Sequence, residues 1–137
     1  MTARREARSA AAGDLDEVMR LLERAGIHVA RESLERRVTD EHSGIVLAGE
    51  ACASWVVDGG ALHVYDVVGD TGSLVPVIEH LNGVARERFA AVMVVTAYEG
   101  DPTADTLTML GFERDWDEAD VRGGRPVRLL GLIREVR

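Results

Sequence analysis

The sequence has no lysine, one cysteine and few aromatic residues. All 16 basic residues are arginines, so a lysine nucleophile or Schiff base is excluded. The single cysteine, Cys52, cannot form an internal disulfide and provides no cysteine cluster for a metal. No run approaches the roughly 18 apolar residues of a membrane span, and the N-terminal residues lack the apolar core of a secretory signal. We therefore expect a cytoplasmic protein that does not enter a membrane.

Acidic residues outnumber basic ones, which gives a formal net charge of −8 and an isoelectric point near 5.0. This balance repels a phosphate backbone and argues against nucleic acid as a partner. It favours neutral or cationic partners. The length of 137 residues, 46% of them hydrophobic, suits one domain with its own core over residues 1–137.

The first half of the chain predicts a short strand, two helices and three strands. The strand is expected at 3–7, a helix capped by Asp14 and closed by Gly26 follows, and a second helix is expected at 32–40. Residues 44–68 are rich in β-branched and small residues. Turn residues at 49–50 and 58–60 divide them, which predicts an antiparallel meander.

The second half predicts helix, strand, helix and hairpin. Because proline is tolerated in the first turn of a helix, Pro76 predicts a helix that begins with Ser73 as its N-cap. The apolar run 91–98 predicts a central strand covered on both faces. Asp101 and Pro102 predict the start of a helix that Gly111 ends. A hairpin of strands 112–121 and 126–136 closes the chain.

This order of elements resembles that of the GCN5-related N-acetyltransferases over essentially the whole chain. Arg5-Glu6-Ala7 followed by Asp14-Leu15 is similar to the family's first strand and helix, and Leu110-Gly111-Phe112 to the LGF that ends its fourth helix. The resemblance implies an α/β (α+β) fold, with a mixed, mostly antiparallel seven-stranded sheet flanked by four helices. It also implies acetyl-CoA as cosubstrate and a small-molecule amine as acceptor.

The resemblance is poorest in the loop that holds the CoA pyrophosphate. The family's loop has an Arg or Gln, two residues, a glycine, one residue, and a second glycine or an alanine. No register of Gly69-Asp70-Thr71-Gly72 keeps both glycines, and the Asp70 carboxylate would oppose pyrophosphate. A plain tight turn therefore remains an alternative to a CoA loop. If the loop binds CoA, the resemblance assigns the cofactor contacts to Val67, Val68, Gly69, Gly72, Ser73 and Leu74.

The catalytic groups implied by the resemblance are only partly present. The family's tyrosine acid, four residues before the glycine of LGF, is Leu107 here. Glu99 and Asp66 lie where the fold opens its cleft, and either could act as a base through water, since a free amine is mostly protonated at neutral pH. Tyr65 and Tyr98 could line the same cleft and bind substrate. Each also fits a structural role, as a solvated carboxylate at a strand end or as a core aromatic.

No metal site is expected, because His63 and His80 have no ligand spacing and no nearby cysteine. Two function classes remain open. The first is an acyl-CoA-dependent N-acyltransferase that transfers acetyl to an amine of a small molecule, and the acidic composition favours a neutral or cationic acceptor. The second is a catalytically degenerate domain of the same fold. Such a domain would serve in binding or assembly, or run other chemistry in the same cleft. The sequence leaves open whether the protein forms a homodimer.

Overall fold

The computed structural model describes residues 6–137. Its N-terminal part contains β1 (Arg8–Ser9), a short 3-10 helix (Ala12–Asp14), α1 (Leu15–Arg24) and α2 (Arg31–Thr39). Residues 3–5 of the strand expected at 3–7 lie outside the described residues, residues 6–7 are not in a strand, and the first strand described is β1. None of the helices within residues 6–137 is long and apolar enough to cross a membrane.

Six longer strands form the rest of the sheet. They are β2 (Ser43–Ala48), β3 (Ala51–Asp58), β4 (Ala61–Val68), β5 (Val92–Tyr98), β6 (Glu113–Arg122) and β7 (Arg125–Glu135). The strand order is β1-β2-β3-β4-β5-β7-β6. Within the described residues, β4 and β5 form the one parallel pair and every other pair is antiparallel. With α3 (Thr71–Glu87) and α4 (Pro102–Met109), this confirms the predicted mixed sheet flanked by four helices.

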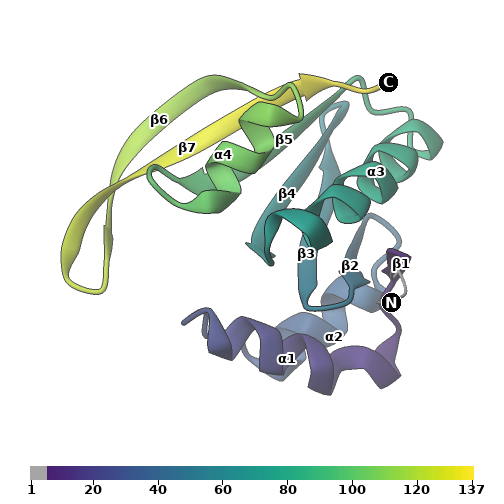
Figure 1. The fold of residues 1–137 in the computed structure, drawn as a ribbon. Helices are drawn as coiled ribbons and strands as arrows, with labels where there is room; N and C mark the ends of the chain where they lie inside the picture. The colour runs from purple at the N-terminus through teal and green to yellow at the C-terminus, as the bar shows by residue number, and fades with distance from the viewer. Residues whose placement is uncertain (1–5) are drawn as a thin grey trace.

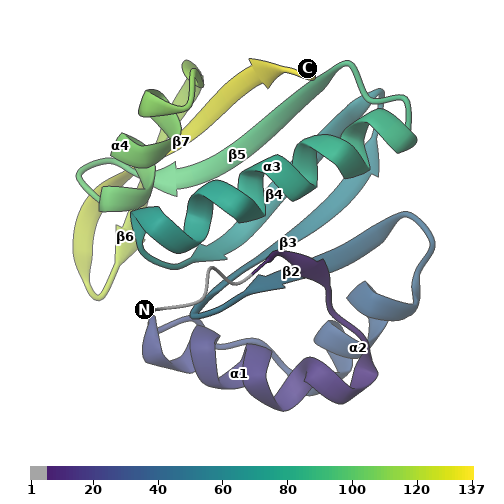
Figure 2. The ribbon, with the colours of Figure 1, turned by 45° about the vertical axis from the view of Figure 1, so that its right-hand side comes forward.

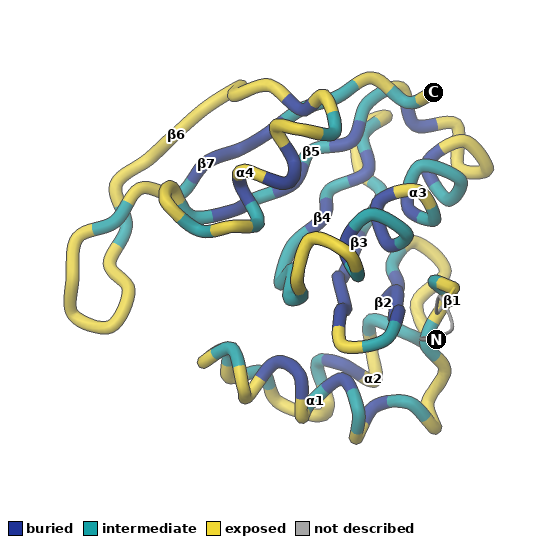
Figure 3. The backbone as a smooth tube through the Cα atoms, viewed as in Figure 1, coloured by how far each residue is buried: buried dark blue, intermediate teal, exposed yellow. Residues whose placement is uncertain are grey.

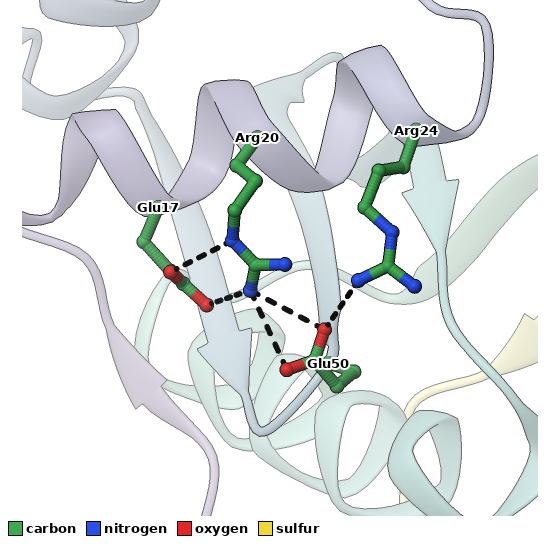
Figure 4. A network of polar contacts seen from close by, with 4 residues as sticks. All are labelled: Glu17, Arg20, Arg24 and Glu50. Atoms are coloured by element: carbon green, nitrogen blue, oxygen red, sulfur yellow. Dashed lines mark hydrogen bonds and ion pairs between the residues drawn. The ribbon is translucent and has the colours of Figure 1, made fainter.

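The helices cover opposite faces of the sheet, as Figures 1 and 2 show for α1 and α2 on one side and α3 and α4 on the other. Alternate residues of the strands separate two cores. On β2, Val46 packs with the α3 and α4 side chains, whereas Ile45 and Leu47 pack with those of α1 and α2. An arginine of α1, Arg20, also reaches the β2–β3 turn, where it contacts Glu50 (Figure 4).

The start of α3 differs from the prediction. The helix begins at Thr71 and its N-cap is Asp70, so the expected N-cap at Ser73 is wrong. Pro76 therefore lies in the second turn and leaves the carbonyl of Gly72 without its helical N–H partner. Gly72 is exposed, so water can bind that carbonyl.

The central strand is covered less evenly than expected. β5 lies inside the sheet, between β4 and β7, as predicted. Its residues alternate between buried and half-buried, and Met93, Val95 and Ala97 form the buried set. The second face is not fully covered, because the core under α1 and α2 contains no residue of β5. The β6–β7 hairpin is still more open, with β6 exposed along nearly its whole length (Figure 3).

Candidate active site

A cleft opens where the two parallel strands separate. β4 and β5 pair from Ala61 with Val92 to Val64 with Val95 and no further, and Figure 1 shows them diverging beyond that point. The space between them has a volume of about 550 Å³. It is lined by the ends of both strands, the loop after α1, the turn into α4 and the β6–β7 hairpin: Ala25, Gly26, Ile27, Tyr65, Asp66, Val67, Val68, Gly69, Thr96, Ala97, Tyr98, Asp101, Thr103, Arg122 and Leu129.

The facing edges of β4 and β5 have no strand partner along this cleft. Their unpaired N–H and C=O groups can bind an extended ligand in the manner of an added strand. On β4 the edge is also bulged, because the register with β3 shifts between Cys52 and Ser54. At the bulge Asp66 has a φ of 51°, a left-handed backbone that non-glycine residues adopt rarely. The bulge changes the direction of the Tyr65 and Asp66 side chains at the cleft wall.

Asp66 is held by an arginine from α2. Arg37 Nη1 lies 2.9 Å from Asp66 Oδ2 and donates to Ser54 Oγ at 2.8 Å. Its guanidinium also lies over the Tyr65 ring, 4.8 Å from the centroid. The two charged side chains are only 13% and 25% exposed. A proton placed on Asp66 Oδ2 would disrupt this ion pair, which disfavours Asp66 as the base.

The opposite wall of the cleft carries a second polar group of side chains. The Tyr98 hydroxyl donates to Asp120 Oδ2 at 3.2 Å. Arg122 stacks on the Tyr98 ring at 4.7 Å, and its Nη1 lies 2.7 Å from Asp101 Oδ2. Burial, and then the charge and hydrogen bond of Asp120, raise the pKa of the Tyr98 phenol. Tyr98 therefore stays protonated at neutral pH.

The predicted cofactor residues fall into two groups. Val67, Val68 and Gly69 line the cleft. Gly69 has a φ of 144°, and a Cβ there would lie 2.4 Å from Ala51 Cβ, so the backbone needs glycine at this position. Gly72, Ser73 and Leu74 belong to the first turn of α3 instead, and the Leu74 side chain is buried in the core.

The N-terminus of α3 already binds one carboxylate. Asp70 Oδ1 accepts the Ser73 N–H at 2.9 Å, and the Leu74 N–H bonds to the Asp70 carbonyl. Within the described part of the chain, the amides of Thr71 and Gly72 are left without a partner. An incoming anion therefore meets the free amides of Thr71 and Gly72, together with the Asp70 carboxylate that occupies the Ser73 amide.

Glu99 lies next to the cleft but outside its lining. It follows Tyr98 directly, its side chain is exposed, and it forms no ion pair with a described residue. Leu107 is buried in the core, and the nearby hydroxyl of Thr106 bonds to Thr71 Oγ1 and to the Pro102 carbonyl. The place of the family's tyrosine therefore holds no acid.

Other reactive side chains do not contribute to this cleft. Cys52 is buried beneath α1, and burial raises its pKa to about 12, so its thiol is not a nucleophile. Among residues 6–137, no three His, Cys, Asp or Glu side chains come together as a metal site would require.

The sequence prediction missed four of the polar side chains around the cleft. Arg37, Asp120 and Arg122 carry no motif, and the sequence predicts Asp101 only as a helix cap. They come from α2, from β6 and from the turn before α4, so tertiary packing alone brings them to the strand ends. A search for charged residues next to predicted strand ends could have found Asp101 only.

Comparison with solved structures identifies the architecture. A probable acetyltransferase from Staphylococcus epidermidis superposes with a TM-score of 0.82 and 16% identity, covering 97% of this chain and 99% of that one. A ribosomal-protein alanine N-acetyltransferase from Escherichia coli gives 0.81 and 13%, covering 96% and 94%. The protein yncA from Salmonella typhimurium, solved with acetyl-CoA, gives 0.77 and 16%, covering 98% and 95%. The chain has the fold of the GCN5-related N-acetyltransferases. No protein-family model and no curated protein matches the sequence.

Proposed function

We propose that this protein is an acetyl-CoA-dependent N-acetyltransferase that acts on the amine of a small molecule. The observation that carries this proposal is the cleft between the diverging ends of β4 and β5, with an unpaired strand edge on each side. Solved structures of the same fold include one named as a putative phosphinothricin N-acetyltransferase and a spermidine/spermine N-acetyltransferase. Both names specify small-molecule amines, which agrees with a cleft of this size.

The cleft fits the pantetheine arm of acetyl-CoA better than the α3 N-terminus fits its pyrophosphate. The arm is narrow and carries amides, which the edges at Val67 and Val68 can bind through backbone groups. At the helix, the amides of Thr71 and Gly72 and the helix dipole favour an anion, whereas Asp70 opposes it. We therefore propose weak binding of acetyl-CoA, in which Asp70 leaves the Ser73 amide.

Glu99 is the better of the two candidate bases. Bound acetyl-CoA would supply the acetyl group as a thioester, whose carbonyl carbon bonds to the amine nitrogen as its bond to sulfur breaks. The amine needs a base to become the free nucleophile. The Glu99 carboxylate is exposed at the end of β5 and can accept this proton through water, whereas Asp66 is engaged by Arg37.

The test is an acetylation assay with three amines of different charge, namely spermidine, phosphinothricin and a peptide that begins with alanine. Release of the CoA thiol and the mass of the product report transfer. We expect product with at least one amine. Glu99→Gln should lower the rate at neutral pH and recover at high pH, where free amine is abundant, while Asp58→Asn at the β3–β4 turn serves as the matched control. If none of the three amines gives an acetylated product, the proposal is contradicted.

The alternative is a domain of this fold that binds other molecules without catalysis. The observation that favours it is the capping of the Ser73 amide by Asp70, which occupies part of the expected anion site. Thermal melts with millimolar acetyl-CoA separate the two functions. A ligand at one hundred times its Kd stabilises the fold by about 2.7 kcal/mol, which moves the midpoint by several degrees. An unchanged midpoint, together with absent product, would favour the non-catalytic domain.

A further inference from the structure

Tyr98 lines the cleft, and its hydroxyl meets Asp120, which lies 22 residues further along the sequence and behind the lining. The Tyr98 hydroxyl donates its hydrogen to Asp120 Oδ2, and the other Asp120 oxygen accepts the Val121 amide at 2.8 Å. Because the phenolic hydrogen is already used, the hydroxyl offers a ligand only an oxygen lone pair. This wall therefore suits a ligand that donates hydrogen bonds.

The charges around Tyr98 point to the same kind of ligand. Asp101 and Asp120 are carboxylates, and Arg122 is the cation that lines the cleft within the described residues. Arg122 is already paired with Asp101 and stacked on the Tyr98 ring. A carboxylate on a ligand would have to compete with Asp101 for Arg122. An ammonium group would instead meet the phenol oxygen and the Asp101 carboxylate at the cleft, with the Asp120 carboxylate behind the phenol and outside the cleft lining.

Tyr98 itself is suited to binding rather than to proton transfer. Burial raises the pKa of its phenol, the charge and hydrogen bond of Asp120 add to this, Asp101 contributes in the same direction, and Arg122 opposes it. The phenol therefore keeps its proton over the working pH range. Its oxygen remains an acceptor for an N–H group both before and after the amine loses its proton to the base.

We propose that the Tyr98–Asp120 pair selects the acceptor as an alkylamine with no carboxylate on the carbon that bears the nitrogen. This inference rests on the proposed acetyl transfer and names the substrate class of the same cleft. Tyr98 contacts the amine N–H, and Asp120 is a positioning residue that fixes the direction of the hydroxyl and adds negative charge. The sequence predicts Tyr98 as a substrate-binding residue, whereas Asp120 does not stand out, since it lies within a run of mostly exposed acidic residues on β6.

The experiment compares butylamine with norvaline, which is the same chain with a carboxylate beside the amine. The wild-type protein should acetylate butylamine at least about tenfold more efficiently, the range expected for a hydrogen bond to a charged group. Asp120→Asn should raise KM for butylamine by about tenfold with little change in kcat. Glu118→Gln, an exposed carboxylate on the same strand, is the matched control and should change neither value.

A second readout does not depend on activity. In a Tyr65→Phe background Tyr98 is the remaining tyrosine, and ultraviolet titration should show that Asp120→Asn lowers the pKa of its phenol. Equal KM values for wild type and Asp120→Asn, or a preference for norvaline, would overturn the inference while leaving acetyl transfer intact.

If no amine is acetylated, calorimetric titration with butylamine still decides the question. Binding that Asp120→Asn weakens would support the amine site even though the proposed transfer had failed. Absence of butylamine binding to the wild-type protein would overturn the site itself.

Discussion

The Asp70 carboxylate accepts a hydrogen bond from the Ser73 amide at 2.9 Å and so caps α3 from within the chain. A carboxylate and a phosphate compete for the same helix N-terminus, since both are anions that bind free N–H groups. The affinity of this protein for acetyl-CoA should therefore depend on the residue at position 70.

Two substitutions separate the charge of Asp70 from its capping bond. Asp70→Asn keeps a capping side chain without the charge, and Asp70→Gly removes both at a cost of only a few tenths of a kcal/mol. We expect acetyl-CoA to raise the melting midpoint more in Asp70→Gly than in wild type, with Asp70→Asn between them. The same ligand-induced shift in all three proteins would show that α3 does not bind the phosphates.

The ion pair between Arg37 and Asp66 should contribute to stability. Arg37→Met leaves a largely buried carboxylate without its cation and should lower the free energy of unfolding by about 2 kcal/mol in urea. The neighbouring Arg36 is exposed, so Arg36→Met is the matched control. In a double-mutant cycle with Asp66→Asn the two effects should not add. Additive effects would mean that the two side chains are not coupled.

Phe89 should be a site of stored strain. It follows the C-cap of α3 with a φ of 58°, and its side chain is 92% exposed. Glycine is the residue that favours this conformation at the end of a helix, so Phe89→Gly should stabilise the protein by about 1 kcal/mol. Phe89→Ala removes the ring but keeps the strain. A stability gain from Phe89→Ala as large as that from Phe89→Gly would show that the ring, and not the backbone, is unfavourable.

Stability should depend on pH through Asp14. The Arg8 guanidinium, at 2.8 Å, and then the Ala11 amide hold the pKa of the Asp14 carboxyl well below its ordinary value of 3.8. The unfolded chain then binds this proton more readily than the folded one, so the contribution is complete above about pH 4 and is lost as the pH falls further.

Urea midpoints measured across the acid range test this dependence. Asp14→Asn should be less stable than wild type at neutral pH, and the gap should narrow as the pH falls below about 4. Asp58→Asn is the control, because Asp58 is exposed at the end of β3. A gap that stays constant with pH would mean that the carboxylate of Asp14 does not couple folding to protonation.

The elements could be predicted wherever local chemistry determines them. Glycines at the turns defined the meander, and Pro102 with Gly111 placed α4. Pro76 misled the prediction, since a proline in the second turn is tolerated where the facing carbonyl, that of Gly72, is exposed. The partners of Asp66 and Tyr98 could not be predicted, because Arg37 and Asp120 reach them through packing between elements distant in sequence.

The parallel pairing of β4 with β5 also has a consequence for how the protein folds. The strands of the meander are joined by tight turns, so their pairing closes only short loops. Pairing of Val64 with Val95 must instead close a loop that contains all of α3, and long loops lose more chain entropy on closure. We expect this pair to form late in folding. The cleft begins where that pair ends. A folding intermediate that has most of its secondary structure but lacks this pair would therefore lack the cleft as well.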